Sequence, residues 1–134
     1  MNTFLVLSCL ITLTYGAQNE CQCGAFVSLP DSEQEVLAFP PIDVDSCSEI
    51  LECSVRCKYE WEAFTFDGDL CRQTSDGSTV GQVMCENLEK KGIENIDPHP
   101  VFLYYRVCEG PWGFDYQSSK QELVCKNGNV VLNC

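Results

Sequence analysis

The residues of this chain best suited to chemistry are its cysteines, which either bind metal ions as thiolates or form disulfide bonds. Zinc sites usually combine C-x₂₋₄-C pairs with further Cys or His ligands at matching spacing. Cys53 and Cys57 have that spacing, but no second such pair occurs, and the single histidine, His99, lies between two prolines. We therefore expect no metal or other cofactor, and we interpret the cysteines as disulfide partners.

The N-terminus decides which cysteines are available for pairing. Residues 4–13 form an apolar run that is too short to span a bilayer but fits the core of a secretory signal peptide, and residues 16–17 are small enough for cleavage. We expect residues 1–17 to be a signal peptide and residues 18–134 to be a secreted, extracellular, cysteine-rich domain. Cys9 leaves with the leader. Ten cysteines then remain, an even number typical of a disulfide framework: Cys21, Cys23, Cys47, Cys53, Cys57, Cys71, Cys85, Cys108, Cys125 and Cys134.

The sequence contains few residues that are suited to other kinds of catalytic site. A Ser or Cys nucleophile needs a base, usually His, within hydrogen-bond reach, and His99 lies in a proline-flanked surface loop. Acid–base hydrolysis needs two converging carboxylates, but Glu49, Glu52 and Glu60 fall on the solvent face of a predicted helix. Asp67-Gly68-Asp69 does not match an EF-hand calcium loop. We expect the protein not to be an enzyme.

The chain is strongly acidic, and this restricts its partners. The formal net charge is −12, and residues 31–69 contain eleven acidic residues against Arg56 and Lys58. Binding to nucleic acid or to anionic membranes depends on clustered Lys and Arg, so we expect neither nucleic-acid binding nor membrane insertion. The acidity either serves solubility or attracts a basic partner surface or Ca²⁺.

One aromatic segment has the composition of a contact site. In Gly110-Pro111-Trp112-Gly113-Phe114, a Pro/Gly-framed loop presents Trp112 beside Phe114 and Tyr116. Aromatic side chains on a rigid loop are typical of binding hot spots. The alternative is that Trp112 folds back onto the C-terminal hairpin and covers its core, because small proteins need their aromatic residues for burial.

Two helices are predicted to position these residues. The first, near residues 47–61, follows a Ser46-x-x-Glu49 capping box, and its buried face is expected to carry Cys47, Ile50, Cys53, Ser54, Cys57 and Trp61. A short β segment should follow, in which residues 63–66, Asp67-Gly68 and residues 69–72 resemble a tight hairpin or turn. The second helix, at about residues 80–91, begins with a Thr79-x-x-Gln82 box and ends before Gly92.

The strand signals are concentrated near the C-terminus. Residues 101–108 are rich in Val, Phe, Leu and Tyr, and Asn127-Gly128 predicts a type I′ hairpin between residues 121–126 and 129–134. In that register Lys126 faces Asn129, Cys125 faces Val130, Leu123 faces Leu132, and Gln121 faces Cys134. Residues 25–45 contain three prolines and are expected to form a mostly irregular arm.

The strand register also constrains the disulfides. Cys125 and Cys134 would lie roughly 13 Å apart in the hairpin, too far to bond to each other. Cys53 and Cys57 lie about 6 Å apart on one helix face, and Cys21 and Cys23 lie about 6.6 Å apart on one face of an extended segment. The matching spacings suggest two parallel disulfides between these pairs, whereas the connectivity of the remaining cysteines stays open.

Part of the chain resembles a known module. Cys53-x₃-Cys57, then Ala63-Phe64-Thr65-Phe66, then Cys71 resembles the helix-then-strand core of PAN/apple modules, which are secreted domains that bind proteins or carbohydrates. The resemblance covers about 25 residues and implies a strand at residues 63–66. Trp61-Glu62 stand where such modules usually carry a further cysteine. No site residue follows from this resemblance.

These observations predict a small, disulfide-rich α+β single domain. Two short helices should pack on an antiparallel sheet of residues 101–108, 121–126 and 129–134. The expected function is that of a secreted, non-enzymatic binding protein, such as a venom-type toxin or defence effector acting on an extracellular receptor, channel or enzyme. The alternative is an acidic extracellular structural or matrix protein with weak cation binding. We expect a monomer whose partner is an extracellular protein.

Overall fold

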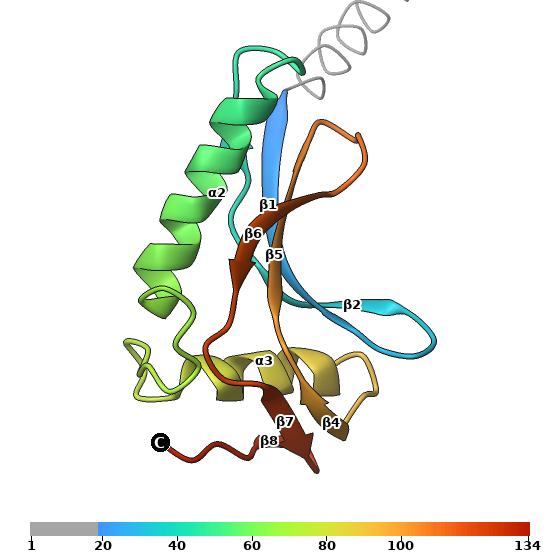
Figure 1. The fold of residues 1–134 in the computed structure, drawn as a ribbon, viewed down its shortest axis with the longest axis vertical. Coiled ribbons are helices and arrows are strands. Elements are labelled where there is room, and N and C mark those ends of the chain that lie inside the picture. The colour runs from blue at the N-terminus through green and yellow to red at the C-terminus, as the bar shows by residue number, and fades with distance from the viewer. Residues whose placement is uncertain (1–18) are drawn as a thin grey trace, which may run out of the picture.

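The computed structural model describes residues 19–134, which form a small disulfide-rich α+β domain (Figure 1). The predicted signal peptide, residues 1–17, lies outside the described residues together with Cys9. One long helix lies along the main sheet, and a shorter helix crosses below it, next to a small second sheet (Figure 1). No helix within residues 19–134 has the length and apolar character needed to cross a bilayer.

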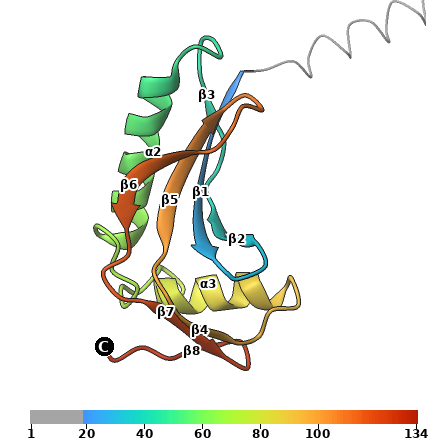
Figure 2. The ribbon, with the colours of Figure 1, turned by 45° about the vertical axis from the view of Figure 1, so that its right-hand side comes forward.

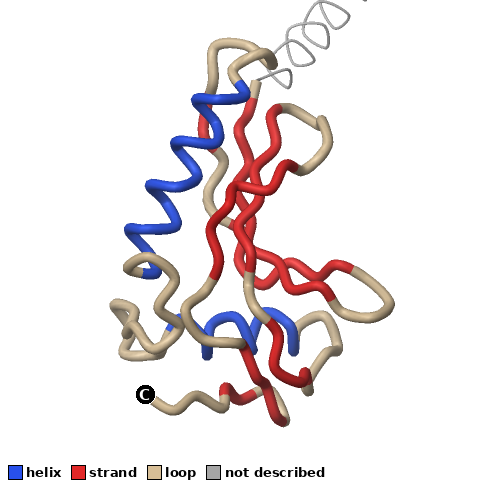
Figure 3. The backbone as a smooth tube through the Cα atoms, viewed as in Figure 1, coloured by secondary structure: helices blue, strands red, loops and turns tan. Residues whose placement is uncertain are grey.

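The main sheet is built around β1, Glu20–Ser28. On one side it pairs with β2, Glu33–Ala38, and on the other with β5, Phe102–Val107, whose far edge carries β6, Gly113–Ser118 (Figure 3). All these pairings are antiparallel. The short strand β3, Ile42–Asp43, pairs with the start of β1.

The strands β1, β2 and β3 correct the prediction of an irregular arm at residues 25–45. Pro30 lies in the turn between β1 and β2, and Pro40 and Pro41 lie between β2 and β3. Because proline cannot donate a ladder hydrogen bond, it is confined to strand ends and edges. The three prolines therefore mark the boundaries of strands and not the absence of strands.

Helix α2, Ile50–Thr65, packs on the buried face of the main sheet (Figure 2). Its buried residues, Cys53, Cys57, Trp61 and Thr65, follow one another at i, i+4 spacing. The predicted start at residue 47 and the capping box were wrong, because Glu49 caps the helix without a side-chain hydrogen bond. Cys47 and Ile50 are exposed, not buried as predicted, and Ser54 is half-buried.

The β segment predicted at residues 63–66 and 69–72 was wrong, whereas the chain does turn at residues 67–68. Helix α2 continues to Thr65, since this buries one further turn of its inward stripe. The chain then reverses through three left-handed residues, Phe66, Asp67 and Gly68. Residues 63–66 are accordingly mostly helical, and the strand implied there by the PAN/apple resemblance is not present.

Helix α3, Val80–Glu89, lies close to its predicted position. Thr79 Oγ1 accepts a hydrogen bond from the Gln82 backbone N–H at 3.1 Å, as the capping box requires. The Gln82 side chain does not complete the box. Its Nε2 donates to the Gly128 carbonyl and its Oε1 accepts from the Val130 N–H, which ties α3 to the C-terminal hairpin.

A second, three-stranded sheet packs against α3. It has the order β4-β7-β8 and consists of β4, Ile96–His99, β7, Leu123–Lys126, and β8, Asn129–Val130. The single predicted sheet was therefore wrong, because the strand at residues 102–107 belongs to the main sheet and not beside the hairpin. Strand β5 pairs instead with β1 on one edge and with β6 on the other, within the main sheet.

The type I′ hairpin itself is confirmed in its central register. Asn127 and Gly128 both have positive φ, at 53° and 78°, and Cys125 pairs with Val130 while Lys126 pairs with Asn129. The outer predicted pairs do not form, because β8 ends at Val130 and the chain leaves the ladder toward Cys71, to which Cys134 is bonded.

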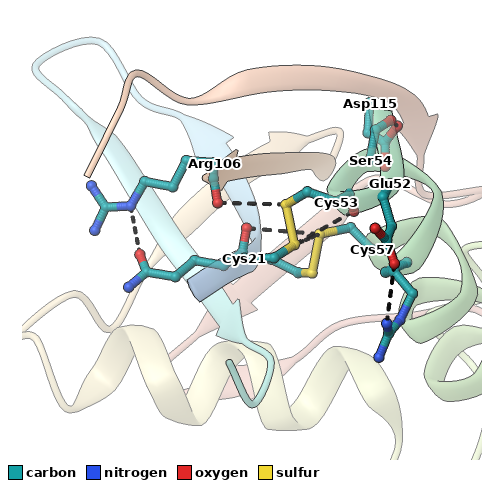
Figure 4. The surroundings of a disulfide bond; sticks show 10 residues. Cys21, Glu52, Cys53, Ser54, Cys57, Arg106 and Asp115 are labelled. Carbon is teal, nitrogen blue, oxygen red and sulfur yellow. Dashed lines mark hydrogen bonds and ion pairs between the residues drawn. A yellow bond between two sulfur atoms is a disulfide. The ribbon is translucent and has the colours of Figure 1, made fainter. Parts of the chain in front are cut away.

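Five disulfides link segments that are far apart in the sequence. Cys21 bonds to Cys53 and Cys23 bonds to Cys57, with Cα–Cα distances of 5.4 and 5.3 Å, which confirms the parallel pair predicted from spacing (Figure 4). We call these two bonds the paired disulfides. The others are Cys47–Cys108, Cys71–Cys134 and Cys85–Cys125. Cys125 and Cys134 do not bond to each other, as predicted.

Candidate functional site

The paired disulfides explain the only cysteine cluster with metal-like geometry among the described residues. The sulfur atoms of Cys21, Cys53 and Cys57 lie within 4.8 Å of one another and are buried. Each of these sulfurs is bonded to another sulfur, so no thiolate is left there to coordinate an ion. The cluster is a structural link between β1 and α2.

The face of the main sheet turned away from α2 carries a different kind of site. Successive strand residues point to opposite faces, so Cys21 and Cys23 turn toward α2 while Phe26 points outward. The neighbouring strands add further outward-facing rings. We call this set the aromatic face, and it consists of Phe26, Phe102, Tyr104, Trp112, Phe114 and Tyr116.

The rings of the aromatic face form one continuous series of contacts. Phe26 contacts Tyr104 at 5.4 Å and Trp112 at 5.1 Å between ring centroids. Phe114 contacts Tyr104 at 5.6 Å and Tyr116 at 4.9 Å. Edge-to-face and tilted pairs at these distances are favourable beyond their buried area. The rings therefore hold one another in a fixed arrangement.

The structure brings together all three residues predicted as binding candidates. Phe114 is 39% exposed and Tyr116 is 85% exposed, whereas Trp112 is half-buried. Trp112 does not cover the C-terminal hairpin. Its ring packs on Phe26, and the guanidinium carbon of Arg106 lies 4.6 Å from its centroid.

Sequence reasoning missed the other half of the aromatic face. Phe102 and Tyr104 were assigned to a strand but not to a site, and Phe26 was placed in an irregular arm. A usable signal was present, because Trp112, Phe114 and Tyr116 alternate at i, i+2, i+4, as residues on one face of an extended segment do. Phe102 and Tyr104 show the same alternation.

Asp115 fixes the orientation of β6. Its side chain is buried, and its Oδ1 accepts a hydrogen bond from Ser54 Oγ of α2 at 2.5 Å (Figure 4). Its Oδ2 has no hydrogen-bond partner. Burial raises the pKa of Asp115, against the opposing effects of the Ser54 hydrogen bond and the Lys58 charge. Because Asp115 points inward, its neighbours Phe114 and Tyr116 point outward.

Tyr116 has an unusual backbone conformation for its side chain. Its φ is 59°, in the left-handed region that bulky residues rarely occupy. Such conformations cost of order 1–3 kcal/mol and persist only where the surroundings enforce them. Here the inward anchor at Asp115 and the ring contact with Phe114 hold the backbone, and the result is a phenol ring displayed to solvent.

A hollow of about 260 Å³ opens beside the aromatic face, lined by Phe26, Glu33, Tyr104 and Trp112. Ser28 Oγ lies 2.8 Å from each carboxylate oxygen of Glu33 and donates to that carboxylate. Burial, together with the negative charge of Glu33, raises the pKa of Tyr104. The Glu33 carboxylate therefore lies close enough to Tyr104 for its charge to oppose ionisation of the Tyr104 hydroxyl.

A second hollow of about 270 Å³ adjoins the first across Trp112, and its polar lining residues are Gln22, Glu35 and Arg106. Arg106 Nε donates to Gln22 Oε1 at 2.5 Å. Burial raises the pKa of Glu35, and the positive charges of Lys91 and Arg106 partly oppose that effect. Gly24 makes room for Glu35, because a Cβ at this position would lie 2.5 Å from its carboxylate.

The opposite side of the molecule carries a second exposed apolar group. Leu51, Val55 and Tyr59 follow one another at i, i+4, i+8 along α2 and are 78%, 42% and 65% exposed. Tyr59, the one aromatic residue of the three, forms no aromatic pair among the described residues. This stripe provides matched control positions for the aromatic face.

Comparison with known proteins gives no relative: no protein-family model, no curated protein and no solved structure matches the chain. The PAN/apple resemblance is thus not supported by a match, and the strand it implies is absent. The interpretation of the site depends on its geometry alone.

Proposed function

We propose that this chain is a secreted, non-enzymatic binding protein that contacts an extracellular protein partner through the aromatic face. The observation that carries this proposal is the continuous series of aromatic rings on an uncovered sheet face, ending in a tyrosine that is 85% exposed. Apolar and aromatic groups gathered on a surface mark interaction sites more often than isolated exposed side chains do.

The backbone at Tyr116 supports a role in recognition. A glycine or asparagine would relieve the left-handed conformation, yet the position holds a large aromatic residue whose ring is mostly in solvent. Strain of this kind gathers at functional positions. Folding alone gives no reason for a strained, exposed tyrosine.

The disulfides support an extracellular location and a rigid binding surface. Five disulfides in a chain of this length are typical of proteins from oxidising compartments. Strand β1, which carries Phe26, is bonded directly to α2, so the aromatic face rests on a covalently linked layer. A rigid surface loses little conformational entropy on binding. Venom-type toxins and defence effectors that act on a receptor, channel or enzyme share this design.

His99 is the histidine that a nucleophilic mechanism in this chain would use as its base. Its Nδ1 donates to the Asp97 carbonyl at 2.6 Å, and within residues 19–134 no serine or cysteine side chain is hydrogen-bonded to its ring. A nucleophile activated by this histidine would need such a contact.

Site-specific photo-crosslinking tests the proposal. The protein is prepared with p-benzoylphenylalanine in place of Tyr116 or, as the matched control, in place of Tyr59 on α2, and is then irradiated in native extracellular fluid. We expect a defined adduct from position 116 that excess unlabelled protein suppresses, and no such adduct from position 59. An adduct confined to position 59, or none suppressible at position 116, would contradict the proposal.

A further inference from the structure

We propose that the hollow formed by Phe26, Tyr104, Trp112 and Glu33 receives a basic side chain, Arg or Lys, of the protein partner. This inference rests on the proposed function, because it names the group of the partner that is recognised at one end of the aromatic face. We call this hollow the cation pocket.

The ring arrangement suits a cation. Phe26 contacts both of the other rings, and its plane is steeply inclined to each of them, at 88° to Tyr104 and 68° to Trp112. Aromatic faces attract cations through the quadrupole of the ring, and a group of rings around one space is the usual site for an alkylated or guanidinium cation.

Glu33 adds a full negative charge to the same space. Glu33 lines the hollow, and Ser28 Oγ, 2.8 Å from each of its carboxylate oxygens, donates to that carboxylate and holds it in place. An apolar ligand would gain nothing from a carboxylate at this point and would have to desolvate it. A basic side chain would both stack on the rings and form an ion pair with Glu33.

The molecule already uses the same interaction elsewhere. The guanidinium of Arg106 lies over Trp112, and that of Arg72 lies 3.8 Å from the ring centroid of Phe66. Arg106 lines the neighbouring hollow and not the cation pocket. Trp112 therefore lines both hollows. Arg106 is a lining residue of the neighbouring hollow, whereas no basic residue of the described chain lines the cation pocket.

The charge of the whole chain favours a cationic partner. The net charge is −12, and within residues 19–134 the one ion pair is Glu52–Arg56, so most carboxylates have no internal counter-charge. A large net negative charge accelerates association with basic partners and repels acidic ones.

The position of the pocket favours a side chain of a protein over a free small cation. Phe102, Phe114 and Tyr116 extend the aromatic face beyond the pocket. A free ammonium ion would leave these rings uncovered, whereas a protein that inserts one basic side chain can cover them with its surrounding surface. The pocket volume of about 260 Å³ leaves room for the end of one basic side chain.

Nuclear magnetic resonance titration tests the inference. The probe is N-acetyl-arginine methylamide, its neutral isostere is N-acetyl-citrulline methylamide, and tetramethylammonium represents a free quaternary cation. We expect saturable shifts of the Trp112 indole N–H signal with the arginine probe and binding of citrulline weaker by roughly fivefold or more. The indole of Trp61, which is fully buried, is the internal control and should not shift.

Two variants distinguish the local effect of the Glu33 charge from the effect of the overall negative charge of the protein. Glu33→Gln should weaken arginine binding about fivefold. Glu122→Gln makes the same charge change at an exposed residue beside β7 and should leave binding unchanged. Equal binding of arginine and citrulline, or no effect of Glu33→Gln, would overturn the inference. Tighter binding of tetramethylammonium than of arginine would overturn the assignment to a side chain in favour of a free ligand.

A third variant separates this inference from the proposed function. Tyr116→Ser lies outside the cation pocket and should leave arginine binding unchanged while it reduces binding of the crosslinked partner. If Tyr116→Ser weakens partner binding but Glu33→Gln does not, the proposed function stands and the cation pocket is wrong. If neither variant weakens partner binding, the proposed function itself fails.

Discussion

Three consecutive residues of β6 show how the site is formed. Asp115 points inward to Ser54, and Phe114 and Tyr116 on either side of it point outward. The buried carboxylate has one oxygen without a partner, so it is held at a cost that the fold must offset elsewhere. The inward position of Asp115 places the two neighbouring aromatic rings on the surface in a defined orientation.

The raised pKa of Asp115 predicts a pH dependence of stability. In the unfolded chain its pKa is near the ordinary value of about 3.9. Since burial raises the folded-state pKa, the folded state binds the proton more readily, and stability rises as pH falls through the folded pKa toward the unfolded one. Asp115→Asn cannot titrate, so the unfolding free energy of the wild type relative to this variant should rise from pH 7 to about pH 4 and then level off.

Urea denaturation of both proteins across this pH range measures the difference. Glu35 also has a raised pKa and contributes in the same direction in both proteins, so its effect cancels in the comparison. A difference that stays constant with pH, or that falls as pH is lowered, would contradict the inward placement of Asp115.

Trp112 is predicted to contribute to both stability and binding. It is half-buried against Phe26 and Arg106, so Trp112→Ala should lower the unfolding free energy by about 1–2 kcal/mol, less than the 3–5 kcal/mol of a fully buried tryptophan. Thermal denaturation should show a folded protein with a lowered midpoint. Complete unfolding would mean that Trp112 is a core residue, and an unchanged midpoint would mean that its packing contacts are not formed.

At the scale of elements, β1 and α2 were only partly predictable. The i, i+2 and i, i+4 spacings of four cysteines were sufficient to predict the paired disulfides, because rigid geometry leaves few ways to match them. The strand β2 was not predictable, since its sequence Glu-Gln-Glu-Val-Leu-Ala has no regular alternation. β2 is a strand because it pairs with the edge of β1. This pairing is a tertiary effect that the local sequence does not indicate.

The paired disulfides should be strongly non-additive in stability. Each closes nearly the same loop, with sequence separations of 32 and 34 residues. Removing one leaves the loop closed by the other, whereas removing both releases loop entropy of about 3–4 kcal/mol. A double-mutant cycle should therefore compare Cys21→Ala/Cys53→Ala, Cys23→Ala/Cys57→Ala and the variant that combines all four changes.

We expect the combined variant to lose about 2–4 kcal/mol more than the sum of the two separate losses. The cavities left by the buried sulfurs are the same in the separate and combined variants, so they largely cancel. Urea denaturation under non-reducing conditions gives the three values. Losses that add to within about 0.5 kcal/mol would show that the two bonds do not constrain the same loop.

At the scale of the whole molecule, the disulfides define two covalently closed regions and one further link. The paired disulfides join β1 to α2, and Cys71–Cys134 and Cys85–Cys125 join the region around α3 to the C-terminal hairpin. Cys47–Cys108 links the first region to the end of β5, next to the segment that leads to Trp112. The aromatic face lies on β1, β5 and β6 of the main sheet and on the segment that holds Trp112.

This long-range assembly explains what sequence alone could not predict. The fold class, the second helix and the centre of the hairpin follow from local patterns, such as the Thr79 cap and the Asn127-Gly128 turn. The pairing of β1 with β5 joins Phe26 to Phe102, residues with no local relation in the chain. Half of the aromatic face depends on that pairing, and so does the cation pocket.

The account is tested most directly by the affinity of the crosslinked partner for two matched double variants. Phe114→Ser/Tyr116→Ser removes two exposed rings from the aromatic face, and Leu51→Ser/Tyr59→Ser removes two exposed apolar groups from α2. We predict that the first variant stays folded and binds the partner about tenfold more weakly or worse, whereas the second binds like the wild type. Unchanged binding by the first variant, or loss confined to the second, would contradict the assignment of the aromatic face as the contact surface.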